Sequence, residues 1–75
     1  MAITKSIGHK KRYKKPYAIT YWIGEEKRRT VEQFNTLREA RRAYGYIVKD
    51  IEDEASGAAD LYSNYGRRHL DGIFE

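Results

Sequence analysis

The chain has 75 residues and a formal net charge of +4, with 35% charged residues, 40% hydrophobic residues and no cysteine. A chain of this size buries only about 60% of its unfolded surface, so we expect one core and one domain. The absence of cysteine excludes disulfides, thiolate metal sites and cysteine nucleophiles. No apolar run reaches the roughly 18 residues of a membrane span, and no signal-peptide pattern opens the chain, so we expect a cytoplasmic protein without membrane contact.

The charge is distributed unevenly along the chain. Residues 1–42 hold twelve Lys or Arg and four Glu, whereas residues 43–75 hold three basic and seven acidic residues. A basic arm over 1–15 precedes the expected domain over 16–75, and such arms are attracted to the phosphate backbone of nucleic acids, although a charge run can also be only a solvated tail. The arm cations that we expect on phosphates are Lys10, Lys11, Arg12, Lys14 and Lys15.

Alternating residues after Pro16 predict a β-hairpin. Four large apolar residues share one side of the first strand, Tyr17, Ile19, Tyr21 and Ile23. Residues 24–27 read as the connection and 28–34 as the return strand. Because Val31 and Phe34 have opposite parity, a bulge or a bend near Gln33 is needed if both are to reach the core. An earlier strand somewhere in 2–14 is expected to complete a three-stranded sheet.

An amphipathic helix is expected to begin at Thr36. Thr36 and Glu39 form a capping box, in which the Thr36 hydroxyl accepts a hydrogen bond from the N–H of Glu39. Gly57 is placed to end the helix. Gly45 lies inside the helix, where glycine costs about 1 kcal/mol relative to alanine, so we expect something to pack closely there. Apolar residues recur at helical spacing along one face: Leu37, Ala40, Tyr44, Ile47, Val48, Ile51 and Ala55.

The segment after Gly57 is expected to form a second, shorter helix, because Leu61, Tyr62 and Tyr65 are at helical spacing before Gly66. The apolar residues Leu70, Ile73 and Phe74 are expected to fold back onto the sheet or onto a second subunit. The predicted fold class is therefore α+β: a small antiparallel sheet of two to three strands packed on one long helix, with a short C-terminal helix.

Cations also gather at the start of the predicted helix, at Arg38, Arg41 and Arg42, while acids fill its last turns. This order is opposite to the one that the helix dipole favours. Together with the basic hairpin residues Lys27, Arg28 and Arg29, these arginines predict a cradle for phosphates.

The outward side of the first strand presents Thr20 and Trp22, with Arg28 and Thr30 beside them if the register is simple. Such a face can read bases in a DNA major groove. The alternative for Trp22 is burial against its neighbours.

Neither a metal site nor a catalytic site is expected. His9 and His69 lie sixty residues apart without flanking ligands. A catalytic pair of His69 and Asp71 would need a pocket and a nucleophile that so small a chain has little room to enclose. We therefore expect no cofactor and no enzymatic activity.

Three runs together resemble the arm-type DNA-binding domain at the N-terminus of phage and transposon tyrosine recombinases. They are Tyr17-Ala-Ile-Thr-Tyr-Trp, the basic Lys27-Arg-Arg, and Phe34-Asn-Thr-Leu-Arg-Glu-Ala, and the resemblance covers about residues 13–54. It implies a three-stranded antiparallel sheet laid in the major groove with one helix behind it.

Carried over by position, the resemblance implies that four residues face the groove, Thr20, Trp22, Arg28 and Thr30. It also implies that Lys27, Arg29 and the arm lysines contact phosphates. This chain departs from the pattern in the two acids at its hairpin tip, Glu25 and Glu26, and in its last twenty residues, for which the resemblance gives no counterpart.

These features predict a small non-enzymatic nucleic-acid-binding module, a regulator of a phage or mobile element that binds duplex DNA through its basic hairpin and arm. RNA stays open as the partner, because a basic arm does not distinguish the two. The alternative is a phage- or plasmid-type inhibitor that binds a host or defence protein through a tyrosine-rich or acidic C-terminal surface. A homodimer also stays open.

Overall fold

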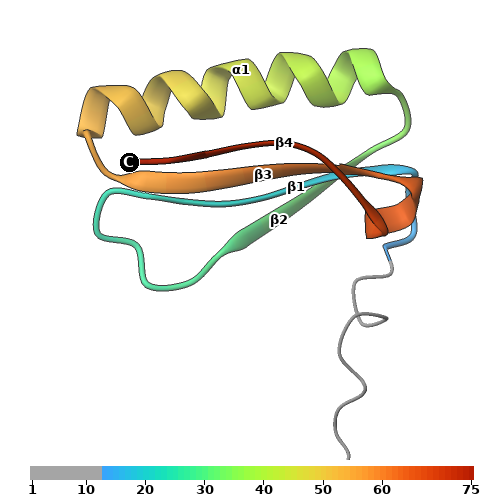
Figure 1. Ribbon diagram of the computed structural model, residues 1–75, viewed down its shortest axis with the longest axis horizontal. Coiled ribbons are helices and arrows are strands. Elements are labelled where there is room, and N and C mark those ends of the chain that lie inside the picture. The colour runs from blue at the N-terminus through green and yellow to red at the C-terminus, as the bar shows by residue number, and fades with distance from the viewer. Residues whose placement is uncertain (1–12) are drawn as a thin grey trace, which may run out of the picture.

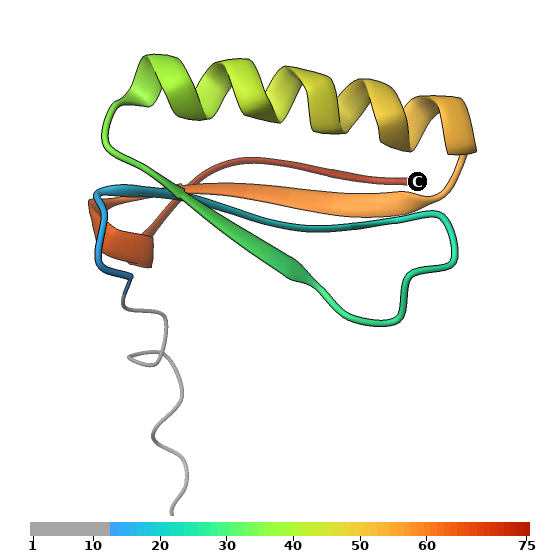
Figure 2. The ribbon, with the colours of Figure 1, turned by 180° about the vertical axis from the view of Figure 1, so that it is seen from behind.

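The computed structural model describes residues 13–75, so the strand expected in 2–14 and the arm cations Lys10, Lys11 and Arg12 lie largely or wholly outside it. The elements follow in the order β1 (Tyr17–Ile23), β2 (Thr30–Phe34), α1 (Leu37–Glu54), β3 (Gly57–Ser63), a 3-10 turn (Asn64–Gly66) and β4 (Arg68–Phe74). The strands form one antiparallel sheet in the order β2-β1-β3-β4, and α1 covers one of its two sides (Figures 1 and 2). The α+β class is confirmed, but the sheet has four strands and not the two to three that the sequence predicted.

The core lies between α1 and the two central strands. Ile19 of β1 is paired with Leu61 of β3, so both side chains point to the helix side of the sheet, and both are fully buried. Tyr44, Ile47 and Ile51 of α1 pack on them at helical spacing. The apolar periodicities of the strand and of the helix therefore meet in one cluster.

The β1–β2 hairpin is regular and lacks the expected bulge. Tyr17 is paired with Phe34 and Tyr21 with Thr30, without a shift of register. Phe34 packs on the core, whereas Val31 points to the side of the sheet away from α1 and is 45% exposed. Val31 and Phe34 therefore do not both reach the core, because strict alternation sends them to opposite sides of the sheet.

The helix begins as predicted and ends slightly earlier. The Glu39 N–H donates to the Thr36 hydroxyl oxygen at 3.2 Å, which confirms the N-cap. Ala55, and not Gly57, adopts the left-handed conformation that ends the helix, with φ of 57°. The expectation of close packing at Gly45 was wrong: within the described residues, nothing beyond its chain neighbours and the adjacent helix backbone lies within 4 Å of the place that a Cβ would take.

The expected C-terminal helix is instead the β3–β4 hairpin. Asn64 and Tyr65 both have positive φ, near 52° and 57°, and reverse the chain in a tight turn. Tyr65 is held by backbone hydrogen bonds, donating to Pro16 O and accepting from the Tyr13 N–H, each at 3.0 Å. Leu70 and Ile73 pack against the core as expected, whereas Phe74, for which the same was expected, is 79% exposed.

In the part of the chain that the structure describes, no helix combines the length and the apolar character that crossing a membrane requires.

Candidate nucleic-acid interface

The side of the sheet that α1 leaves uncovered, here called the open face, is the expected base-reading surface. The cross-strand register assigns ten side chains to it: Ala18, Thr20, Trp22, Val31, Gln33, Ala58, Asp60, Tyr62, His69 and Phe74. Thr30 pairs with Tyr21 and belongs to the helix side, so its expected place beside Thr20 and Trp22 was wrong. In the β1–β2 hairpin, each odd-numbered residue of one strand is paired with an even-numbered residue of the other, as Tyr21 is with Thr30. This register could not be predicted from the sequence alone.

The β1–β2 hairpin forms one edge of the sheet, and its loop turns away from α1 toward the open-face side (Figures 1 and 2). Lys27 and Arg28 lie in this loop and are exposed. Within residues 13–75, neither side chain has an ion-pair partner. The hairpin therefore presents two cations without ion-pair partners near its tip, next to Glu25 and Glu26, although Arg28 precedes the strand rather than lying within it.

Arg29 lies over the open face, not on its rim. Its Nη1 donates to Thr20 Oγ1 at 3.0 Å, to Thr20 O at 3.3 Å and to Asp60 Oδ2 at 3.2 Å. Thr20 is only 4% exposed, so it has little surface with which to contact a base directly. Of the residues expected to read bases, Trp22 is half-buried on this face, and the exposed Arg29, which was expected to contact phosphates, also lies there.

Asp60 is the centre of a polar cluster that sequence reasoning missed. Its Oδ1 lies 2.9 Å from His69 Nε2, and its Oδ2 binds Arg29. A Cβ on Gly72 would come within 2.7 Å of Asp60 Oδ1, so the bare glycine leaves room for the Asp60–His69 pair. Burial and then the charge of Asp60 raise the pKa of Tyr62 above its ordinary value, and a hydrogen bond with Thr20 offsets part of this effect.

The chain enters the domain beside the same hairpin. Gln33 of β2 accepts hydrogen bonds through Oε1 from the backbone N–H groups of Lys14 and Lys15, at 2.8 and 3.1 Å. Gln33 belongs to the open face, so the root of the basic arm is fixed at the foot of the hairpin on that side. Cations therefore stand at both ends of the hairpin, which are about 20 Å apart for six strand steps.

The arginines at the start of α1 do not join the hairpin. The hairpin loop lies at the other end of the helix, where the Gly24 N–H donates to Ser56 O at 2.9 Å (Figure 1). Arg41 pairs with Asp71 at 3.2 Å, while Arg38 and Arg42 are exposed on the helix, on the opposite side of the sheet from the open face. The expected cradle of hairpin and helix start is not formed, because the antiparallel hairpin returns the chain to the far end before α1 begins.

The surfaces expected for a protein partner are also distributed differently. The tyrosines do not form one surface, because Tyr44 is buried, Tyr46 is on α1, Tyr62 is on the open face and Tyr65 is in the turn. Acids gather instead at the hairpin-tip end of the molecule, around an open hollow of about 440 Å³. Its lining residues are Ile23, Gly24, Glu25, Glu26, Asp50, Asp53 and Glu54.

The part of the chain that the structure describes is electrically neutral but polar. Residues 13–75 carry eleven Lys or Arg and eleven Asp or Glu, and the other four cations precede Tyr13. Within residues 13–75, no group of three or more His, Asp or Glu side chains is arranged to hold a metal ion. The exposed cations Lys27 and Arg28 offer hydrogen-bond donors and positive charge to an acceptor-rich ligand, whereas the acids around the open hollow offer acceptors and negative charge.

No family model matches the chain, and searches of the curated proteins and of the solved structures find no match either. The resemblance to recombinase arm-type domains therefore stays a prediction.

Proposed function

We propose that this protein is a non-enzymatic module that binds duplex DNA through its β1–β2 hairpin and its basic arm. The observation that carries the proposal is the position of the cations, with Lys27 and Arg28 near the tip of an edge hairpin and Lys14 and Lys15 fixed at its foot. A major groove about 12 Å wide admits a two-stranded ribbon. The full sheet, with about 14 Å between its outer strands, is too wide to enter it, so the edge hairpin leads.

In this arrangement, the tip and the foot of the hairpin contact phosphates, and the side chains between them face the bases. Arg29 and Trp22 lie between the two ends, next to the exposed Val31. An arginine donates to guanine, and an apolar side chain contacts the methyl group of thymine. Asp60 holds the guanidinium of Arg29 at a fixed place over β1 and β3.

The test is a fluorescence-anisotropy titration of the full chain with labelled duplex DNA, single-stranded DNA and RNA at several salt concentrations. Four phosphate contacts, made by Lys14, Lys15, Lys27 and Arg28, would give a slope of log K against log salt near −3.6, at about −0.9 per contact on duplex DNA. Further contacts by the rest of the basic arm would make the slope steeper. Lys27→Ala with Arg28→Ala is expected to flatten the slope by about 1.8. The matched control is Glu25→Gln with Glu26→Gln, which changes the same loop without removing a cation and is expected to leave the slope in place.

Base reading is tested separately from charge. Arg29→Ala is expected to cost about 1–3 kcal/mol on a selected site and little on a scrambled duplex. Because Asp60 loses its partner in that variant, Val31→Ala, which leaves the polar cluster intact, serves as the second probe. Binding of the wild type that is undetectable at low salt, or that does not weaken when Lys27 and Arg28 are removed, would contradict the proposal.

A second candidate function is inhibition of a protein, and one observation favours it. Phe74 of β4 is 79% exposed and stands in the same cross-strand row as the half-buried Trp22, with Ala58 between them. Exposed apolar side chains on an uncovered sheet face mark many protein interfaces. No binding to any of the three nucleic acids would move the proposal to a protein partner on this face.

A further inference from the structure

The outward side of α1 carries three cations in one line, here called the crest: Arg38, Arg42 and Lys49, with the acids Glu52 and Asp53 on the same side one turn after Lys49. Steps of four and seven residues return to the same face of a helix, and all three side chains are exposed. Within residues 13–75, none of them has an ion-pair partner. The crest lies on the side of α1 that faces away from the sheet, and so on the opposite side of the molecule from the open face.

Gly45 lies in the middle of the crest, between Arg42 and Lys49. Glycine destabilises a helix interior relative to alanine, and no packing explains it here, since the space around it is empty among the described residues. The arginines at the helix start also oppose the dipole. Two departures from helix stability on one exposed line point to a ligand, and a glycine lets a ligand approach the backbone closely.

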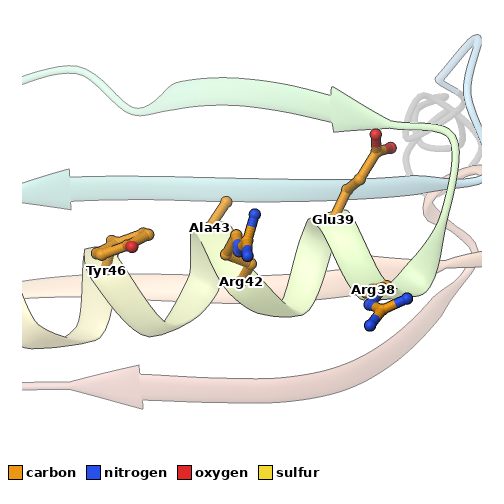
Figure 3. A pocket seen from close by; sticks show the side chains of 5 residues that line it. All are labelled: Arg38, Glu39, Arg42, Ala43 and Tyr46. Atoms are coloured by element: carbon orange, nitrogen blue, oxygen red, sulfur yellow. The ribbon is translucent and has the colours of Figure 1, made fainter.

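A hollow of about 500 Å³ lies along the first half of the crest (Figure 3). The guanidinium groups of Arg38 and Arg42 and the 68% exposed Tyr46 offer several donors to it, while Ala43 lines it with an apolar group. Glu39 is the one acid of its lining. This surplus of donors and positive charge fits a ligand that is rich in acceptors and negatively charged.

We propose that the crest binds the phosphate backbone of a second nucleic-acid duplex, without reading its sequence. Arg38 and Lys49 are eleven residues apart, about 16 Å along the helix, which is roughly the axial rise of five base pairs of a duplex. Gly45 lets the backbone of that strand approach α1 between the cations. The inference rests on the proposed function for the first duplex, and it adds that one molecule holds two duplexes, one on each side.

A bridging assay tests this inference. A biotinylated duplex is fixed on beads, the full chain is added, and capture of a second, fluorescent duplex is measured at low and moderate salt. The wild type is expected to capture it. Arg38→Ala, Arg42→Ala and Lys49→Ala in one variant are expected to leave binding to the fixed duplex within about twofold and to reduce capture of the second at least tenfold. Three lost contacts would remove about 2.7 from the salt slope of capture.

Two further variants test the effect of the neighbouring acids and the role of Gly45. Glu52→Ala with Asp53→Ala removes charges beside the end of the crest, and capture is expected to be kept or strengthened. Gly45→Leu is expected to raise the melting temperature, because leucine favours the helix, and to weaken capture about tenfold by keeping the phosphates at a distance. Capture by Gly45→Leu equal to that of the wild type would overturn the role of the glycine.

The failure of this inference differs from the failure of the proposed function. If the triple crest variant captures the second duplex as well as the wild type, or if the wild type binds one duplex and never a second, the crest proposal is overturned. If the crest variant instead loses all binding while Lys27→Ala with Arg28→Ala keeps it, the hairpin proposal fails and the crest is retained as the binding surface. The oligomeric state of the free protein is measured by sedimentation velocity alongside each assay. If the protein is a dimer and the crest variant still bridges two duplexes, the proposal is also overturned.

Discussion

Replacement of Leu61 by alanine tests the strand that the sequence reading took for a helix. Leu61 is fully buried and lies opposite Ile19 in the β1–β3 pairing. Removal of about three methyl or methylene groups costs about 2.4 kcal/mol in transfer free energy, at roughly 0.8 kcal/mol each. The cavity that remains brings the typical loss for a buried leucine to about 2–5 kcal/mol.

This loss is large for so small a domain. At about 0.05–0.15 kcal/mol per residue, the described part of the chain has a free energy of unfolding of about 3–9 kcal/mol. A loss of about 3 kcal/mol would lower the melting temperature by roughly 12–24 °C, at about 4–8 °C per kcal/mol for domains of this size.

The assay is urea unfolding, followed in parallel by far-ultraviolet circular dichroism and by the fluorescence of Trp22, the one tryptophan of the chain. The control is Val31→Ala, which also shortens an aliphatic side chain in the sheet but at a position that is 45% exposed, and it is expected to cost less than about 1 kcal/mol. If Leu61→Ala costs no more than Val31→Ala, Leu61 does not lie in the core and the pairing of β3 with β1 is refuted.

Three further changes test other parts of the fold. Thr36→Ala removes the hydroxyl that accepts from the Glu39 N–H and is expected to lower the free energy of unfolding by about 0.5–2 kcal/mol in urea titrations, and an unchanged midpoint would contradict the cap. Gly72→Ala is expected to destabilise the protein, since its Cβ would come within 2.7 Å of Asp60 Oδ1, whereas Gly45→Ala is expected to stabilise it by up to about 1 kcal/mol. Changes of melting temperature in the same direction for both variants would refute this contrast. Burial, followed by the nearby carboxylates Asp71 and Asp60, raises the pKa of Tyr44, so its neutral form is favoured in the folded state, and stability is expected to fall as the pH rises above about 10 through the folded pKa. Tyr44→Phe is expected to remove that part of the alkaline loss, measured by denaturant titration at several pH values, and an identical loss in both proteins would speak against it.

The first half of the fold could be predicted because local patterns decide it. The alternation after Pro16 gives β1, and the Thr36 cap with the apolar spacing gives α1. The register of β2 against β1 could not be predicted in the same way. Sequence spacing left Thr30 free to lie on either side, and the six-residue connection in the structure, longer than the four residues expected, puts Thr30 beside Tyr21.

The second half was misread because two periodicities compete in it. Leu61, Tyr62 and Tyr65 match a helical turn, but Ala59 and Leu61 also alternate with Asp60 and Tyr62 as a strand requires. Asn64-Tyr65-Gly66 is a turn signal between two such runs, and it was the signal that could have identified the hairpin. Without that hairpin, nothing in the sequence indicated that Asp60 and His69, nine residues apart, would meet, so the polar cluster of the open face was not predicted.

The separation of charge in the fold explains why the candidate surfaces divide into two. The β1–β2 hairpin runs the length of the sheet and returns before α1 begins, so Lys27 and Arg28 end up at the opposite end from Arg38 and Arg42. A helix with its side chains is about 10–12 Å thick, and the sheet adds a further layer, so one duplex cannot rest flat against both the open face and the crest. The hairpin cations and the helix arginines, which were expected to form one cradle, therefore lie on two surfaces. Either each surface binds its own anionic ligand, or one surface binds a ligand and the cations of the other remain solvated. The bridging assay decides between these two cases, because only the first lets a molecule that already holds one duplex capture another.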